Sequence, residues 1–480
     1  MTELLPNPLV WLILLPLGWA ALAFWLGPGR GRILALSGIT LQLLAALSLA
    51  ADILHHGTVT HLVGGWQEPL GILLVSDGLS AVMLLLTQAV TLPVAIYACQ
   101  YLNRENRRWF WPLTGFLLAG MNALYLSGDL FNLYVTLELI GLAAVGLVAV
   151  GGRSEQVAAA LRYLLASLAG SGCFLLGVAL LYGCYGTVSS RLLAELINVP
   201  TPPAVWLAAV LICAGLFLKT ALFPLHFWLP PAHGGAPAPI SALLSALVVK
   251  ASFYVLLRLW LGPFAGFIAP LAWLPALLGS LAILWGSWQA IRADRLKMLV
   301  AYSTVAQLGY LFLVFPLFGT GSMALQVGVL QAVAHGLAKA AMFLAAGLLI
   351  KAGGSERVAG VSHAANQLPV TLFAFALAGI SLMGLPPSGG FLAKWLLIDA
   401  ALAAGQVWIA VVAISGGLLA SVYVFRVLLL AFRDTEEGDR PRPQPVAAGM
   451  EWTAFTLAVA GVGLGLAAMP LFRLLEGVGR

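Results

Sequence analysis

The chain has 480 residues, of which 61% are hydrophobic and 9% are charged, and its formal net charge is +6. A soluble domain carries about 25% charged residues, so the composition excludes that class. Apolar runs of about 20 residues recur from end to end and predict a multi-pass membrane protein whose solvent is the lipid bilayer. The basic residues are scattered rather than gathered in a stripe, which argues against nucleic acid as a partner.

No motif indicates a cofactor or a metal ion. The four cysteines lack Cys-x-x-Cys spacing and offer no ligand set for an iron–sulfur cluster or haem. The segment from Gly215 to Thr220 is similar to a phosphate-binding loop, but Leu218 replaces the required glycine. We therefore predict ion translocation only, with any redox chemistry on another chain, and leave open whether that assembly is an enzyme.

Short polar or Gly/Pro-rich segments divide the chain into fourteen predicted membrane-spanning helices. We read the first as a retained span, because no Lys or Arg precedes it while Arg30 and Arg32 follow it, the reverse of a secretory signal. The predicted spans are 6–26, 32–52, 76–99, 109–127, 130–150, 159–183, 204–222 with its continuation, 238–260, 270–291, 297–317, 322–350, 367–403, 407–431 and 452–475.

The loops between these spans alternate in charge. Most of the basic residues lie in the loops that join spans 1–2, 3–4, 5–6, 9–10, 11–12 and 13–14. These residues are Arg30, Arg32, Arg104, Arg107, Arg108, Arg153, Arg292, Arg295, Lys297, Lys351, Arg357, Arg433, Arg440 and Arg442. The positive-inside rule makes this set cytoplasmic and places both termini outside a bacterial-type plasma membrane. The polar stretch from Arg433 to Gly449 is predicted to be a cytoplasmic linker.

Two segments break the helical pattern at membrane depth. The first is 223–239, where five prolines fall in sixteen positions, a density that no continuous helix tolerates. The second is Gly384–Gly390, inside an apolar stretch of 37 residues from Gln367 to Ala403. Paired interruptions of this kind indicate an inverted-repeat transporter whose pathway lies at the breaks. The alternative is ordinary prolines in long loops, against which the apolar flanks argue.

The fold class that follows is an all-α integral membrane protein with two inverted five-helix repeats, each containing a discontinuous helix. The predicted division is an N-terminal three-helix segment (1–108), the first repeat (109–262), the second repeat (263–431), and a linker with the C-terminal helix (432–480). We find no extramembrane segment long enough to form a folded domain.

Charged residues within the predicted spans are the candidate site. Of six lysines in the chain, four lie inside spans, and of eleven glutamates only one lies mid-span. Unpaired and dry, these five charges would cost roughly 12–18 kcal/mol on insertion scales, so they must be paired, hydrated or partly neutral. A histidine one helical turn from one of these lysines extends the set, which is typical of a proton relay. The candidate residues are Glu138, Lys219, Lys250, His335, Lys339 and Lys394.

Some of the intramembrane polar residues also have a structural explanation that does not involve proton transfer. A single intramembrane lysine can snorkel to the interface, which is most plausible for Lys339. His226 and His233 in the first break are either relay members or hydrogen-bonding groups at a helix end, and the sequence leaves both open. The spacing of Arg162 predicts an inward-facing, helix-bridging side chain, and Asp399 near a span end is predicted to be structural.

Five stretches of the chain are similar to the antiporter-like subunits shared by respiratory complex I, membrane-bound hydrogenases and Mrp-type cation/proton antiporters. The resemblance runs from about residue 75 to 430. The stretches are LFNLYVTLE (130–138), KTALFPLHFWLPPAH (219–233), AYSTVAQLGY (301–310), HGLAK (335–339) and GLPPSGGFLAK (384–394).

The resemblance implies a role for each candidate residue. Glu138 would pair with Lys219, Lys250 would be the central carrier, His335 and Lys339 would continue the chain, and Lys394 would be the terminal exchange site. A lysine at 394 rather than a glutamate resembles the D subunit of the Mrp-type antiporters. Two departures exist: the acid at Asp294 is displaced from the family's usual position, and Arg162 stands where the family often carries lysine, which makes shuttling there unlikely.

The predicted function is therefore proton translocation by one subunit of a multisubunit Mrp-type Na⁺/H⁺ antiporter, with other membrane subunits as partners and protons and Na⁺ as the transported ions. The first alternative is a proton-pumping subunit of a complex I-like, hydrogenase or carbon-uptake complex. Lower alternatives are a solute-carrying secondary transporter, which would not need a row of lysines, and a structural scaffold without working titratable groups.

Overall fold

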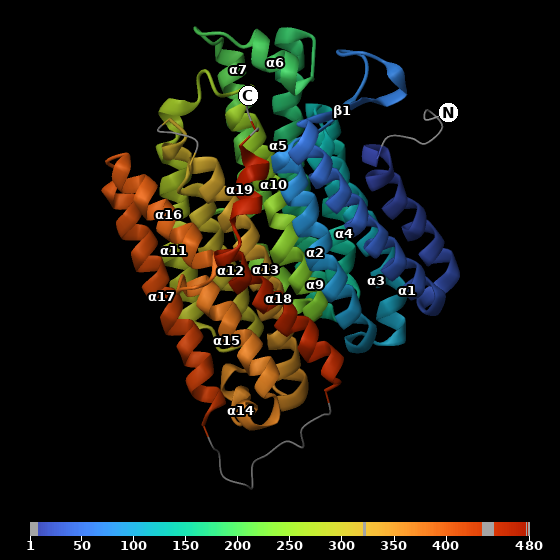
Figure 1. The fold of residues 1–480 in the computed structure, drawn as a ribbon, viewed down its shortest axis with the longest axis vertical. Helices are drawn as coiled ribbons and strands as arrows, with labels where there is room; N and C mark the ends of the chain where they lie inside the picture. The colour runs from blue at the N-terminus through green and yellow to red at the C-terminus, as the bar shows by residue number, and fades with distance from the viewer. Residues whose placement is uncertain (1–7, 320–322, 434–445, 477, 479–480) are drawn as a thin grey trace.

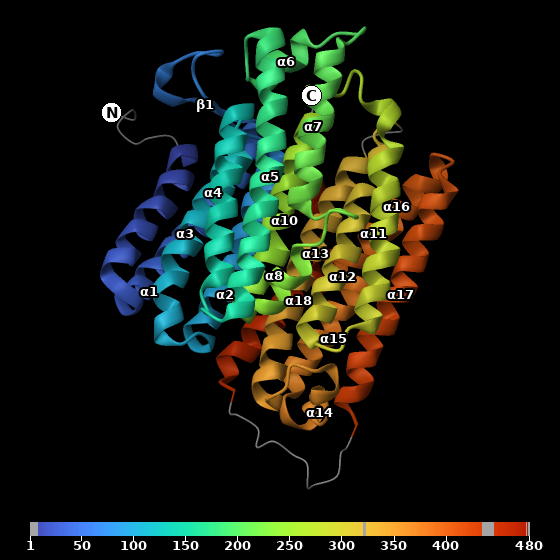
Figure 2. The same cartoon turned by 180° about the vertical axis from the view of Figure 1, so that it is seen from behind.

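A computed structural model of the chain describes residues 8–319, 323–433, 446–476 and 478. Its long helices run side by side along the longest axis (Figures 1 and 2). The helices are α1 (Pro8–His56), α2 (Gly78–Tyr101), α3 (Arg104–Leu126), α4 (Leu130–Ala149), α5 (Ser154–Tyr185), α6 (Ser190–Leu196), α7 (Pro203–Thr220), α8 (Leu229–Gly235), α9 (Ala238–Leu243), α10 (Val249–Leu261), α11 (Trp273–Arg292), α12 (Leu296–Phe312), α13 (Met323–Gly353), α14 (Ala364–Gln367), α15 (Pro369–Met383), α16 (Gly389–Ala403), α17 (Val407–Ala431), α18 (Ala448–Leu466) and α19 (Met469–Leu475).

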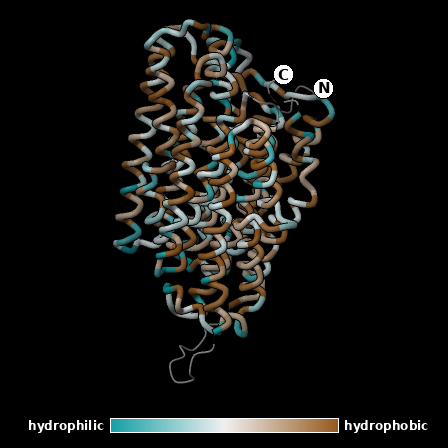
Figure 3. Tube along the Cα trace, turned by 90° about the vertical axis from the view of Figure 1, so that its left-hand side faces the viewer, coloured by the Kyte–Doolittle hydropathy of each residue, from teal (hydrophilic) through white to brown (hydrophobic). Residues whose placement is uncertain are grey.

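The predicted helical membrane architecture is confirmed. Eleven helices in the described ranges are long and apolar enough to cross a bilayer. Hydrophobic residues extend along most of the length of the bundle (Figure 3). The predicted spans 6–26 and 32–52 correspond to α1, which bends sharply at Gly27, where φ is 75° and the backbone is not helical.

Two details of the prediction are wrong. The loop before α2 contains a short antiparallel hairpin of β1 (Val59–Leu62) and β2 (Leu73–Ser76), so the chain is not entirely helical. The predicted span 452–475 is divided into α18 and α19 by Ala467 and Ala468. Both features are too short to carry a periodic sequence signal.

The core of the bundle is formed by α9–α10, α12 and α13. In their most apolar windows, 100% of residues are buried in the α9–α10 segment and 94% in α13, whereas the share is 33% for α1 and for α18. Helices that are apolar all round and buried lie inside a large bundle, while the partly exposed ones form its lipid-facing rim. The candidate lysines 250 and 339 lie on these central helices.

Ion pairs join loops at each of the two ends of the bundle. At one end Arg153, Arg295 and Glu356 form ion pairs that join the α4–α5 loop, the α11–α12 loop and the segment after α13. At the other end Arg191 of α6 pairs with Glu68 of the hairpin loop. The start of α1 and the end of α19 lie at this second end (Figure 1). The linker residues 434–445 lie outside the described residues.

Both predicted interruptions are present. Helix α7 ends at Thr220, where Ala221 adopts a left-handed conformation with φ 58°, and a turn leads into α8. Helix α15 ends at Met383, where Gly384 has φ 82°, and α16 starts at Gly389. A residue in this conformation ends a helix, because its amide turns back to a carbonyl of the last turn. The proline-loop alternative is thereby excluded, since helices flank each break directly.

Candidate functional site

The predicted pair of Glu138 and Lys219 is formed. Lys219 lies in the last turn of α7, just before the first break, and its Nζ lies 3.5 Å from Glu138 Oε1 on α4. The amine also donates to Ser167 Oγ at 2.9 Å, and Ser171 Oγ donates to the Glu138 carboxylate. The two serines lie one turn apart on α5, so this helix supplies a polar stripe between the two charges. Sequence reasoning missed both serines, because small hydroxyl residues in an apolar helix are common.

A small cavity connects this pair with the central helix. It has a volume of about 10 Å³ and is lined by Lys219, Ser167, Val248 and Ser252 among others. A void of this size holds about one water molecule, and its polar lining supplies hydrogen-bond partners for it. The cavity therefore lies between the amine of Lys219 and the helix that carries Lys250.

Lys250 is completely buried. Its Nζ donates to the backbone carbonyl of Ser245, which lies in a single turn of π-helix over Leu244–Val248. A π-turn widens the helix and changes which carbonyls remain available, and such turns are frequent at functional sites. Ser245 Oγ bonds Thr304 Oγ1 at 2.9 Å, which ties this turn to α12.

Lys339 and His335 lie one turn apart on α13, and both are buried. Lys339 Nζ donates to the Val300 carbonyl at 3.0 Å and to Ser303 Oγ, so it points into the bundle and does not snorkel. Neither ring nitrogen of His335 has a hydrogen-bond partner in the described part of the chain. A buried imidazole without partners is costly, which makes it a group that an intervening water would serve.

Lys394 lies just after the second break, in the second turn of α16. Its Nζ donates to the Leu382 carbonyl at 2.5 Å and lies 4.4 Å from the centre of the Tyr310 ring. Beside it is a cavity of about 220 Å³ whose lining includes the exposed residues Trp395 and Leu418. Lys394 therefore lies at the edge of the buried region, next to an open pocket.

Two glutamines that sequence reasoning missed extend the polar line to Lys394. Gln331 Nε2 on α13 donates to Gln307 Oε1 on α12 at 3.4 Å. Gln307 Nε2 then donates to the Leu382 carbonyl at 3.0 Å, the same oxygen that accepts from Lys394. Gln331 lies one turn before His335 on α13. Buried polar side chains among three helices gave no sequence signal, because single amides do not stand out as charges do.

Three other polar residues of the predicted spans, His233, Arg162 and Asp399, make none of the contacts described above. His233 is buried against the Phe343 ring, and neither of its ring nitrogens meets hydrogen-bond geometry with another described residue. The inward orientation predicted for Arg162 is wrong: its side chain is exposed, on the outer face of α5. Helical spacing did not reveal this, because the outer face of α5 is also rich in apolar residues such as Leu161 and Leu165, which are exposed. Asp399 is also exposed, near the end of α16.

Within the described residues no group of three or more His, Cys, Asp or Glu side chains comes together that could hold a metal ion. The candidate site is instead a set of amines, hydroxyls, amides, one imidazole and one carboxylate spread over seven helices. Such groups bind and release protons and hold water, which is the chemistry that the arrangement supports.

Comparison with known proteins places the chain in a family. The family model described as "NADH:quinone oxidoreductase/Mrp antiporter, TM" matches residues 127–420. The NADH-quinone oxidoreductase N subunit of Desulforudis audaxviator is 37% identical, over 92% of this chain and 90% of that protein. The Na⁺/H⁺ antiporter D subunit of Alkalihalophilus pseudofirmus is 30% identical, with the same coverage. A chain in the structure of the Mrp complex from Dietzia superposes with a TM-score of 0.90 at 28% identity, over 98% of this chain and 96% of that one. The chain is thus a multi-pass membrane protein that belongs to the family of antiporter-like subunits found in NADH:quinone oxidoreductases and Mrp antiporters.

Proposed function

We propose that the chain translocates protons as one subunit of a multisubunit Mrp-type Na⁺/H⁺ antiporter in a bacterial-type plasma membrane. The single observation that carries this proposal is the row of buried amines, which starts at the Glu138–Lys219 ion pair and continues through Lys250 and Lys339 to Lys394. Four amines inside one membrane bundle are costly, and only a function that needs titratable groups there explains them.

The proposed architecture has fourteen spans. It counts the two segments of α1 separately and adds α3 and the broken pair α15–α16 to the eleven long apolar helices. Residues 109–262 and 263–431 form the two inverted repeats, flanked by 1–108 and 432–480. The position of the breaks supports this division, because each repeat has its break in the fourth helix. In the orientation that the positive-inside rule predicts, both termini lie outside the membrane.

The proposed mechanism uses each candidate residue in turn. Glu138 stabilises the ammonium form of Lys219 while the two are close, and their separation favours release of the proton. The proton moves through water to Lys250 and then along His335 and Lys339 to Lys394. The hydroxyl groups of Ser167, Ser171 and Ser303 hold the charged groups or the water between them. The cavity beside Lys394 is where the proton exchanges with the outside of the bundle.

A second candidate function is proton pumping within a complex I-like, hydrogenase or carbon-uptake complex. It is favoured by the relative named as the N subunit of NADH-quinone oxidoreductase, which is 37% identical. Lys394 and the relative named as the D subunit of an Na⁺/H⁺ antiporter favour the first candidate. The two candidates share the same proton path and differ in what drives it.

Arg162 supports the proposed membrane partners in both cases. It lies eight residues after the start of α5, about 12 Å along the helix, and its side chain is exposed. A charge at this depth is expensive against lipid, so an acidic or polar group of a neighbouring subunit is the expected cover.

Proton flux in membrane vesicles tests the proposal. The native complex is isolated in vesicles, and a pH-sensitive dye reports flux after an Na⁺ or K⁺ pulse without an electron donor, and separately after addition of NADH or reduced ferredoxin. Flux after the Na⁺ pulse identifies the antiporter, and flux only with the donor identifies the complex I-like pump. Lys250→Ala should abolish flux while assembly, measured by copurification of the other subunits, survives.

Three outcomes contradict the proposal. Normal flux in Lys250→Ala would refute the relay. Transport of an organic solute with no proton flux would favour the secondary transporter. A complex whose flux is unaffected by Lys250→Ala, Lys394→Met and Glu138→Gln alike would make this chain a scaffold.

A further inference from the structure

A second polar cluster lies at the opposite end of the central helix α10 from the π-turn. The Arg258 guanidinium forms a two-pronged ion pair with the Asp77 carboxylate, which caps the N-terminus of α2. Arg258 Nε donates to Tyr254 Oη at 2.9 Å, and Nη2 donates to Ser80 Oγ at 2.8 Å. Tyr254 Oη in turn donates to the Tyr125 carbonyl at 2.7 Å. The lysine row does not use this cluster.

Two members of this cluster, Tyr254 and Arg258, line a pocket at one end of the bundle. This pocket has a volume of about 460 Å³, and Tyr254 and Arg258 line it together with Thr60, Ser127 and Ser190. It lies at the end of the bundle that carries β1, β2 and α6 (Figure 1). Hydroxyl groups and the guanidinium groups of Arg191 and Arg258 on the walls make this pocket suitable for water.

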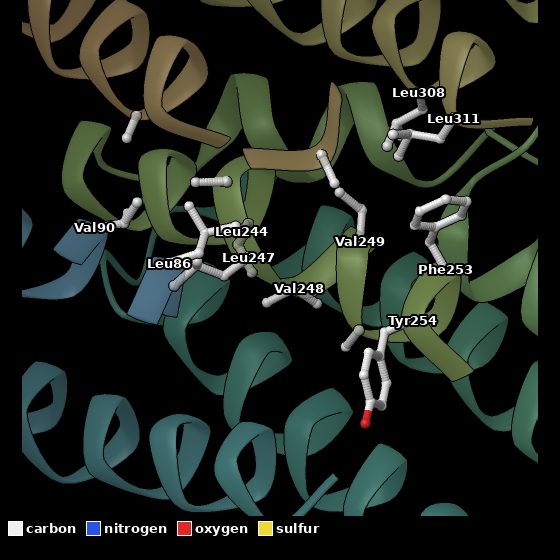
Figure 4. Close-up of a cluster of buried hydrophobic side chains, with 14 of the residues drawn as sticks. Leu86, Val90, Leu244, Leu247, Val248, Val249, Phe253, Tyr254, Leu308 and Leu311 are labelled. Atoms are coloured by element: carbon white, nitrogen blue, oxygen red, sulfur yellow. The ribbon is translucent and has the colours of Figure 1, made fainter. Parts of the chain in front are cut away.

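The residues between the pocket and the lysine row lie on one face of α10. Lys250, Tyr254 and Arg258 are spaced by four residues, so they follow one another along the helix one turn apart. Val249 and Phe253 point from another face of this helix toward Leu308 and Leu311, while the Tyr254 hydroxyl points away from that apolar cluster (Figure 4). Along this face Tyr254 is the next side chain after Lys250 in the direction of the pocket, and it also lines that pocket.

The geometry points to Tyr254 as a gate between Lys250 and the pocket, with the Asp77–Arg258 ion pair as the latch that holds it closed; the inference rests on the proposed proton path. In the closed state the Tyr254 hydroxyl is held from both sides, by Arg258 Nε as donor and by the Tyr125 carbonyl as acceptor. When the ion pair opens, Tyr254 loses one of these partners and water from the pocket can reach Lys250. The gate gives the first half of the molecule its own access to water, separate from the cavity at Lys394.

The latch is built to stay charged. Burial raises the pKa of the Asp77 carboxyl, but the Arg258 guanidinium and the hydrogen bonds from Ser80 outweigh it, and the net pKa lies below the usual value. Guanidinium groups do not lose their proton in proteins. Opening must therefore come from a movement of α2 or α10 rather than from neutralisation of the pair.

Thiol accessibility tests the gate without relying on transport. Lys250→Cys is placed in the full complex, in a chain whose four native cysteines are replaced by serine, and a membrane-impermeant cationic methanethiosulfonate reagent is added from each side of the membrane. We expect slow labelling with Arg258 present. In the Arg258→Gln background we expect labelling from the side of the pocket to accelerate about tenfold, which corresponds to about 1.4 kcal/mol of lost closure. Ser127→Cys, on the pocket wall, is the control and should label equally fast in both backgrounds.

An unchanged rate at Lys250→Cys in the Arg258→Gln background overturns the gate, and so does fast labelling before Arg258 is changed. A second measurement covers the case in which Lys250→Cys does not fold. Tyr254→Phe keeps the ring and removes the hydroxyl, and proton flux should then change several-fold relative to Tyr97→Phe, a buried tyrosine bonded to the Leu344 carbonyl elsewhere in the bundle. Equal flux in these two variants refutes the gate. Failure of the proton path itself would appear instead as normal flux in Lys250→Ala, with the labelling result unaffected.

Discussion

At the first broken helix a lysine lies beside a carboxylate, whereas at the second a lysine lies beside a carbonyl and an aromatic ring. Lys219 pairs with Glu138 at 3.5 Å and with Ser167. Lys394 has no carboxylate within ion-pair distance in the described ranges, and it contacts the Leu382 carbonyl and the Tyr310 ring. Both lysines are almost fully buried, with exposed fractions of 8% and 6%.

The different surroundings of Lys219 and Lys394 suggest how, in the proposed path, one fold holds a proton at one break and releases it at the other. A carboxylate compensates a buried ammonium by a full charge, and in the proposed path this is why the first break holds its proton until Glu138 moves. At the second break the partial negative charge at the C-terminus of α15 and the face of the ring provide weaker attraction. In the proposed path Lys394, which lies next to a cavity of about 220 Å³, is the residue that exchanges its proton with the outside of the bundle.

Removal of the carboxylate is expected to have the largest effect. Glu138→Ala leaves the Lys219 amine buried with only Ser167 as a partner, so flux should fall to background. Stability should fall by about 3 kcal/mol, the lower end for breaking a buried pair, because the Glu138 side chain is 20% exposed. Vesicle flux and the melting temperature of the purified complex measure both effects. The double variant Glu138→Leu with Lys219→Met should recover the stability but not the flux, and recovery of flux would break the comparison.

Removal of the second lysine should separate the two effects. Lys394→Met preserves the length of the side chain and leaves no charge unpaired, since the carbonyl of Leu382 keeps its bond from Gln307. Flux should be lost as in Glu138→Ala. Stability should change by less than about 1 kcal/mol, because Lys394→Met removes the buried amine and leaves no buried polar group without a hydrogen-bond partner. A stability loss as large as that of Glu138→Ala would show that the second break also depends on a charge.

Much of this arrangement was predictable because charges and prolines are rare in apolar helices. Lys219, Lys250 and Lys394 stand out in the sequence for that reason, and the prolines at 224–239 mark the first break. The serines and glutamines that join these amines did not stand out. Their role depends on which helices are neighbours, and this is decided by packing between segments far apart in the chain. Arg162 was placed on the wrong face because leucines also cover the outer, lipid-facing side of α5, so apolar periodicity does not show which side faces inward.

The backbone at the two breaks gives a weaker test of the same comparison. Gly384 has φ 82°, and a Cβ there would lie 2.7 Å from Cδ of Lys394. Gly384→Ala should therefore displace the lysine from the Leu382 carbonyl and lower flux several-fold, with about 1–2 kcal/mol of strain from the left-handed backbone. The measurements are the same flux and melting temperature. Flux equal to that of the unchanged complex would show that the position of Lys394 is not critical.

The first break should tolerate the reciprocal change. Ala221 already adopts φ 58° with a side chain, so Ala221→Gly relieves the strain of that conformation and at the same time increases the freedom of the unfolded chain. The two terms oppose each other, and the melting temperature should reflect a change within about 1 kcal/mol. Flux should not change, because Lys219 is held by Glu138 and Ser167 on other helices rather than by the turn. A loss of flux in Ala221→Gly would mean that the turn itself positions the lysine, and the carboxylate would then not be what distinguishes the first break from the second.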